Sequence, residues 1–312
     1  MKYVTLILTV SLLVCTGISK GQTTHDIKYP LGYSVDISKI TDEKMRYARS
    51  LGITHIELAG MGAILDKNLD TIDVSDQWIS RIRSVREILD RTGMKVWSVH
   101  MPFSNKYDIS LIEEGKRMRV VTAHRNILKA LQPLRIQVIL FHPSYYLGLN
   151  EREARAAQLT KSVAELYTFV NSYGQQMVVE NMLGPALRKG DVERPLLRTV
   201  EECQKLFAGF PKKVGLAVDM CHISNPEKLI LAFGSRVKTV HVSNGTGDAE
   251  SHYLPCDDRG NNDWNAVFAA LRKAKYKGVF MHESKYKDEK ELVDCYNTIW
   301  DNYQSSLTNK KK

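Results

Sequence analysis

The 312-residue chain has five cysteines, and none of them forms a CxxC pair. Such pairs mark structural zinc sites, and dense regular cysteines mark small disulfide frameworks. Four cysteines follow the N-terminal segment, at wide and irregular intervals: Cys203, Cys221, Cys256 and Cys295. The sequence therefore predicts neither a zinc cluster nor a disulfide framework, and we interpret Cys221 as a packing residue.

After the N-terminal segment, no run approaches about 20 consecutive apolar residues, so no transmembrane helix is expected there. There is also no Pro/Gly-rich linker, low-complexity tract, 20–50-residue repeat or Gly-rich phosphate loop. The formal net charge is +9, but no stripe of basic and aromatic residues accompanies it. We therefore expect no nucleic-acid partner and one domain, as a monomer or a homo-oligomer.

Residues 1–21 are predicted to form a secretion signal peptide. Lys2 precedes an apolar run from Val4 to Val14, and Ser19-Lys20-Gly21 offers small residues where a signal peptidase cleaves. Its removal takes away two lysines and no acid, which lowers the charge from +9 to +7. The expected location is the periplasm or the exterior. Cys15 leaves a lipoprotein as an alternative, although Val14 is larger than the residue that usually precedes such a cysteine.

Residues 22–312 alternate between short apolar runs and longer stretches of helical period, which is typical of a parallel α/β fold. We predict eight strands: Leu31–Val35, His55–Leu58, Val96–His100, Gln137–Phe141, Met177–Val179, Val214–Val218, Thr239–Val242 and Gly278–Met281. We predict helices near residues 41–51, 75–92, 110–132, 151–173, 198–208, 226–234, 263–274 and 288–306. The expected fold is a single (β/α)8 TIM barrel, which needs about 250 residues.

Four predicted strands each have a residue that can bind a metal at the point where the apolar run ends. The segments are Val-Val-Glu180-Asn, Ala-Val-Asp219-Met-Cys-His222, Thr-Val-His241-Val-Ser and Phe-Met-His-Glu283-Ser. Because a barrel gathers the carboxyl ends of its strands around one mouth, these side chains should converge. Any one of them alone would fit a helix cap or a satisfied buried polar group. Together they form a hard, mostly oxygen ligand set, which suits Mn²⁺, Mg²⁺ or Co²⁺ better than Zn²⁺.

The strand-end motifs resemble those of the xylose isomerase-like barrel superfamily over nearly the whole mature chain. They are Ser-Val-His100-Met-Pro, Leu-Phe-His142-Pro, Val-Val-Glu180-Asn, Val-Asp219-x-x-His222, Val-His241-Val-Ser and His-Glu283-Ser. That superfamily includes ketose 3-epimerases, inosose dehydratases, hydroxypyruvate isomerases, 3-keto-sugar hydratases and endonuclease IV. The resemblance implies the fold and a metal site, but it leaves the reaction type open.

The ketose epimerase pattern implies a role for each of five residues. Glu180, Asp219, His241 and Glu283 would bind one divalent cation, and His222 would contact the substrate. The two glutamates would also stand on opposite faces of the sugar carbon and exchange its proton. The predicted catalytic residues are therefore Glu180, Glu283 and His222.

One segment departs from the epimerase pattern. Relatives of that type usually carry an arginine three residues before a Pro-Gly pair, whereas this chain has His252 followed by Pro255-Cys256. Arg259 is a candidate replacement for that guanidinium. With His222, the expected substrate-binding residues are His100, His142, His252 and Arg259. Trp97 and Phe103 are candidates either for stacking on a sugar or for core packing.

Endonuclease IV provides an alternative interpretation, a multi-metal phosphodiesterase. That enzyme binds three metals through further histidines on strands three and four and an acid-x-His pair after strand seven. His100, His142 and Glu250-Ser-His252 could fill those positions. The secretion signal and the lack of a basic, stacking surface argue against this hypothesis.

The ligand set itself indicates a reaction class. A divalent cation that chelates a carbonyl and its neighbouring hydroxyl makes the adjacent C–H acidic, and a nearby glutamate can then remove the proton. An exported enzyme without a phosphate loop suits an unphosphorylated keto-sugar or a 3-keto-glycoside derivative. We expect a hydratase or lyase, or an isomerase or epimerase. A catalytically inactive sugar-binding barrel is a further alternative, against which the intact set of four ligands argues.

Overall fold

The computed structural model of the protein describes residues 28–64 and 74–309. The predicted signal peptide and Cys15 lie outside the described residues. Within the described ranges, no helix combines the length and apolar character needed to cross a membrane.

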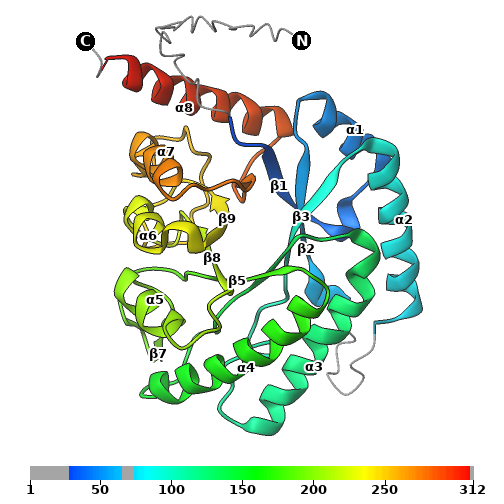
Figure 1. Ribbon diagram of the computed structural model, residues 1–312, viewed down its shortest axis with the longest axis vertical. Helices are drawn as coiled ribbons and strands as arrows, with labels where there is room; N and C mark the ends of the chain where they lie inside the picture. Colours follow the sequence, from blue (N-terminus) through cyan, green and yellow to red (C-terminus); the bar gives the residue numbers. More distant parts are fainter. Residues whose placement is uncertain (1–27, 65–73, 310–312) are drawn as a thin grey trace, which may run out of the picture.

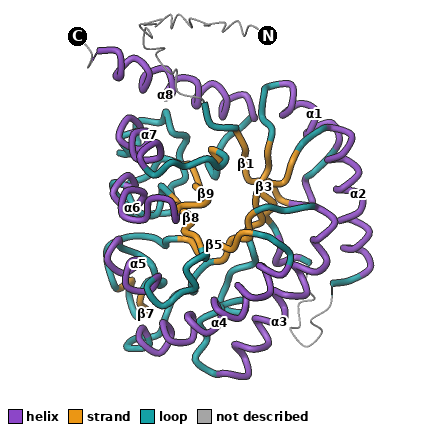
Figure 2. Tube along the Cα trace, viewed as in Figure 1, coloured by secondary structure: helices purple, strands orange, loops and turns teal. Residues whose placement is uncertain are grey.

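Eight parallel strands close into a barrel, which confirms the predicted TIM-barrel fold. Figure 2 shows these strands lining the centre of the molecule. In order around the barrel they are β1 (Leu31–Asp36), β2 (His55–Ala59), β3 (Lys95–His100), β4 (Val138–Phe141), β5 (Gln176–Glu180), β8 (Gly215–Asp219), β9 (Val237–Val242) and β10 (Phe280–His282).

Eight α-helices in the described part of the chain surround this barrel (Figure 1). They are α1 (Asp42–Ser50), α2 (Asp76–Thr92), α3 (Glu114–Leu131), α4 (Arg152–Ser172), α5 (Val200–Phe207), α6 (Pro226–Phe233), α7 (Trp264–Lys273) and α8 (Glu289–Asn309). Several begin at a side chain that accepts a backbone N–H bond. Thr41, Thr199 and Asp263 cap α1, α5 and α7 in this way, which satisfies a donor that the helix leaves free.

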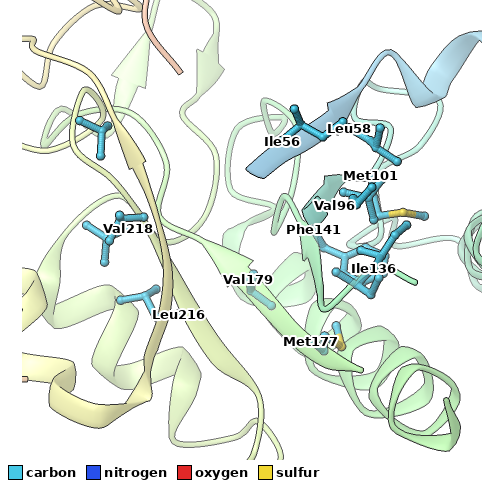
Figure 3. Close-up of a cluster of buried hydrophobic side chains, with 14 of the residues drawn as sticks. Ile56, Leu58, Val96, Met101, Ile136, Phe141, Met177, Val179, Leu216 and Val218 are labelled. Carbon is cyan, nitrogen blue, oxygen red and sulfur yellow. The ribbon is translucent and has the colours of Figure 1, made fainter. Parts of the chain in front are cut away.

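Successive side chains along the strands alternate between two buried environments. Ile56 and Leu58 of β2 and Val179 of β5 belong to the large apolar cluster that packs the strands against the helices (Figure 3). Val178 of β5 and Ala217 of β8 belong to a separate cluster inside the barrel. Because successive side chains of a strand point to opposite faces, the residues that continue the inner series at the strand ends face the mouth.

Two details differ from the predicted elements. A short hairpin, β6 (Arg188–Lys189) and β7 (Val192–Glu193), follows β5, and strands of two residues are too short for a periodic signal. The last barrel strand was predicted at Gly278–Met281, but its pairing with β1 begins at Phe280. The hydroxyl of Tyr276 donates to the Val279 carbonyl at 2.9 Å, which holds this segment in a turn before the strand.

A disulfide joins Cys256 and Cys295, with their Cα atoms 5.5 Å apart. The sequence did not predict it, because the two cysteines lie 39 residues apart and no local pattern pairs them. The bond ties the loop after β9 to α8. Cys203 and Cys221 are free and buried.

Candidate metal centre

The four predicted metal ligands lie together at the mouth of the barrel. Glu180, Asp219 and His241 end their inner series on β5, β8 and β9 and are fully buried, and Glu283 directly follows β10. One possible ligand atom from each of the four lies within 4.8 Å of all the others. The strand-end argument therefore predicted which side chains the fold brings together.

Nδ1 of His241 faces this group of carboxylates. It lies 2.8 Å from Oε1 of Glu180, 2.8 Å from Oε2 of Glu283 and 3.9 Å from Oδ2 of Asp219. Burial would raise the pKa of Glu180, but the charge of His241 and hydrogen bonds from nearby histidines hold that pKa well below its usual range. Glu180 is thus kept as the carboxylate, the form that binds a cation.

The two carboxylate oxygens of Asp219 differ in their surroundings. Oδ1 accepts hydrogen bonds from the backbone N–H groups of Cys221 (2.6 Å) and His222 (3.2 Å). Oδ2 is buried and has no hydrogen-bond partner, and burial raises the pKa of Asp219 to about 6. A buried carboxylate oxygen without a partner is costly unless a proton or a cation neutralises it. The donor set therefore fits a divalent metal ion.

Asn181 fixes the position of Asp219. Its side-chain Oδ1 accepts the backbone N–H of Asp219 at 2.8 Å, and its Nδ2 donates to the Asp219 carbonyl at 3.1 Å. This pair of bonds connects the ends of β5 and β8. The sequence offered only the asparagine next to Glu180 as a signal for this role.

Glu57 is a residue of the site that the sequence analysis missed. It lies on β2, is fully buried, and its Oε2 is 2.9 Å from Nε2 of His241. The same oxygen accepts a hydrogen bond from Oγ of Ser98 at 2.7 Å. The available signal was a lone acidic residue inside the otherwise uncharged strand segment His-Ile-Glu-Leu-Ala.

His100 and His142 form a second group beside Glu180. Their Nε2 atoms are 3.1 Å apart and lie 3.6 Å and 3.0 Å, respectively, from Oε2 of Glu180. Burial lowers the pKa of His142. Burial also opposes the charging of His100, but the hydrogen bond and charge of Glu180 raise the pKa of His100 to about 9.

Glu250 connects two further histidines. Its Oε2 lies 2.9 Å from Nε2 of His222 and 2.9 Å from Nε2 of His252. Burial would raise the pKa of Glu250, but its hydrogen bonds with these two imidazoles lower it. Asp219, His222 and His252 could themselves hold an ion, as could His100, Glu180 and His241.

A cavity of about 350 Å³ opens above these groups. Four predicted substrate contacts line it: His100, His142, His222 and His252. Glu180 and Glu283 line it as well, so the expected catalytic residues share one space with four of the five expected substrate-binding residues.

Arg259 is not brought to the site. Its side chain is 65% exposed, is hydrogen-bonded to Asp257, and lies 4.2 Å from the ring centroid of Tyr253. The local ion pair and the aromatic ring hold the guanidinium at the surface, which corrects the expectation that it replaces the missing arginine.

The two aromatic residues considered for sugar stacking or core packing lie in different places. Trp97 points into the barrel and donates to Oγ1 of Thr239 at 3.0 Å, whereas Phe103 lies at the mouth and is 52% exposed.

Comparison with known proteins identifies the class to which this fold and site belong. A sequence profile of the xylose isomerase-like TIM barrel family matches residues 45–297, and the chain belongs to this family. The family membership that the strand-end motifs indicated is therefore confirmed.

Three similar proteins are all distant in sequence. An uncharacterized protein of Methanocaldococcus jannaschii is 21% identical over 271 residues, which cover 86% of this chain and 97% of that protein. A D-tagatose 3-epimerase-like protein has a TM-score of 0.68 at 18% identity, covering 90% of this chain and 99% of its own. The 3-keto-D-glucoside 4-epimerase of E. coli has a TM-score of 0.66 at 16% identity, and the match covers 88% of this chain and 100% of that enzyme. At these identities the structural likeness shows a shared fold.

Proposed function

We propose that this protein is a divalent-metal-dependent enzyme that enolises an unphosphorylated keto-sugar or a 3-keto-glycoside derivative. The class is a hydratase or lyase, or an isomerase or epimerase. The observation that supports this most is the placement of Glu180 and Glu283, whose carboxylates each lie 2.8 Å from the same His241 nitrogen and face one cavity. The structural relatives named as sugar epimerases support the same class.

The residues that would hold the metal are Glu180, Asp219, His241 and Glu283. When bound, a divalent cation supplies Lewis-acid polarisation of the substrate carbonyl. We expect Mn²⁺, Co²⁺ or Mg²⁺ rather than Zn²⁺, because three of the four donors are carboxylates.

The carboxylates of Glu180 and Glu283, which face the same cavity, can each carry out one of two proton-transfer steps. One removes the proton next to the carbonyl, and the other returns a proton or assists loss of a hydroxyl. Return to the opposite face gives epimerisation, return to the next carbon gives isomerisation, and loss of the β-hydroxyl gives dehydration. His222, hydrogen-bonded to Asn181 and Glu250, lines the cavity, and we expect it to contact a substrate hydroxyl.

Export is part of the proposal. The predicted signal peptide directs the chain to the periplasm or the exterior, and the Cys256–Cys295 bond supports an oxidising compartment. Because phosphorylated sugars are usually held inside the cell, an exported enzyme would meet unphosphorylated ones.

A second candidate function is a multi-metal phosphodiesterase. The observation in its favour is the set of extra imidazoles: His100 and His142 beside Glu180, and His222 and His252 beside Asp219. These side chains exceed the donors that one metal ion needs. Three bound ions per chain and cleavage of a duplex containing an abasic site would support this candidate.

The test of the proposed function is solvent-deuterium exchange into keto-sugars, followed by NMR. The metal-loaded protein is expected to exchange the proton next to the carbonyl, and the chelator-treated protein is expected not to, with recovery when Mn²⁺ is added. A metal-loaded protein that binds a sugar without exchanging its protons would instead be the inactive sugar-binding barrel.

A further inference from the structure

A second cavity, of about 260 Å³, adjoins the one above the metal centre. It lies between the segment after β2, which includes the short helix η2 (Met61–Ala63), and the loop after β3. Both cavities are lined by His100, Phe103 and Glu283. A ligand whose reacting carbon contacts Glu283 can therefore extend into either space.

The walls of the second cavity suit an uncharged group. Apart from His100 and Glu283, which it shares with the first cavity, its described lining residues carry no ionisable side chain other than the phenol of Tyr107. Met61, Met101 and Pro102 supply apolar surface. Since the described lining has no cationic side chain besides that shared imidazole, it does not fit a phosphate group, whereas a sugar ring or an aromatic aglycone matches its apolar and aromatic walls.

Phe103 forms the boundary between the two cavities. Its ring stacks on His142 with centroids 4.0 Å apart, and the side chain is 52% exposed. The contact with His142 fixes the ring while leaving much of it open to a ligand. Rigid aromatic surfaces of this kind bury the apolar face of a ring at little entropic cost.

We propose that the second cavity is a subsite for the non-reacting part of a glycoside, so that the substrate is a keto-sugar still attached to a second ring. This proposal rests on the proposed function, because it takes Glu283 as the residue that contacts the reacting carbon. It narrows the substrate class from any unphosphorylated keto-sugar to a glycoside with a ring-shaped aglycone.

Gly62 offers a way to fill the second cavity without disturbing the metal centre. A Cβ atom at this position would lie 3.8 Å from Cβ of Pro102 and 3.9 Å from Cε2 of Tyr107, at ordinary contact distance. Gly60 is unsuitable, because its φ of 79° favours glycine and a Cβ there would collide with the carboxylate of Asp36. Gly62→Leu is therefore the test variant, and Gly62→Ala is the matched control.

The experiment measures KM for deuterium exchange with free 3-ketoglucose, its methyl glycoside and its phenyl glycoside. For the wild type, KM for the phenyl glycoside is expected to be about tenfold lower than for the free sugar. Gly62→Leu should raise KM for the phenyl glycoside about tenfold, and leave the free sugar and the metal content unchanged. Gly62→Ala should resemble the wild type.

Equal KM values for the three sugars in the wild type, or an equal effect of Gly62→Leu on all of them, would overturn the subsite. A binding measurement separates this failure from failure of the proposed function. Phenyl glucoside, which has no ketone to react, should bind the metal-loaded wild type more tightly than methyl glucoside does in calorimetry. Equal affinities would reject the subsite even if no keto-sugar is turned over or Gly62→Leu does not fold.

Discussion

The Nε2 atom of His241 lies 2.9 Å from Oε2 of Glu57, while Nδ1 of the same ring faces the carboxylates of the candidate metal centre. Both residues are fully buried. An acceptor behind a histidine ligand fixes the orientation of the ring and selects the nitrogen that faces the metal. Glu57 is thus a positioning residue for His241.

Glu57→Gln is expected to weaken metal affinity about 10–100-fold, because a neutral amide holds the imidazole less firmly than a carboxylate does. The measurement is a Co²⁺ titration against a competing chelator, followed through the visible spectrum of the ion. Ser98→Ala is the matched control, since it removes only the 2.7 Å hydrogen bond to Glu57 and should have a smaller effect. Unchanged affinity in Glu57→Gln would show that Glu57 does not position the ligand.

His222→Ala is expected to keep the metal and lose activity. Nε2 of His222 lies 3.8 Å from Oδ2 of Asp219 and is paired with Glu250 at 2.9 Å, and the side chain lines the cavity, so we expect it to contact the substrate rather than the metal. The exchange rate should fall about 100-fold, the typical loss for a proton-transfer or binding group. Loss of the ion together with the activity would make His222 a ligand and favour the multi-metal site.

Glu180→Gln and Glu283→Gln should each abolish deuterium exchange into a keto-sugar. Either change removes a base, and an amide is also a poorer metal donor than a carboxylate, so the variants are assayed at saturating metal. Elemental analysis of the assayed samples controls for occupancy. If one of them exchanges at the wild-type rate, the base lies elsewhere.

Loss of the Cys256–Cys295 bond is expected to lower the free energy of unfolding by about 2–4 kcal/mol, because the bond closes a long loop in the unfolded chain. Urea titration of the double variant Cys256→Ser/Cys295→Ser measures this loss. A reducing agent provides the control, since it should destabilise the wild type to the same level and leave the variant unchanged. Equal stability of oxidised and reduced wild type would count against a formed disulfide.

The sequence predicted the barrel and its metal-ligand candidates because both depend on one regularity. Short apolar runs define the strands, and polar residues at their ends, such as Glu180 and Asp219, must converge once the strands are parallel. His100 and His142 were predicted from the strand-end motifs that resemble the xylose isomerase-like superfamily.

The residues that were missed or misplaced depend on contacts across the barrel or within loops. Glu57 acts through a residue that is 184 positions away in the chain, so no local pattern signals the pair. Arg259 was a candidate replacement for the arginine that the epimerase pattern has near His252, but its ion pair with Asp257, two residues away, keeps it at the surface. Local side-chain partners of this kind decide where a loop residue points.

The measurement that tests the central claim most directly is the metal content of the purified wild type and of Asp219→Ala. Asp219 has a buried carboxylate oxygen without a hydrogen-bond partner, and its removal leaves the proton-transfer candidates Glu180 and Glu283 in place. The account predicts one divalent ion per wild-type chain and almost none in the variant, measured by elemental analysis after equilibration with Mn²⁺. Equal metal content in the two proteins would contradict it.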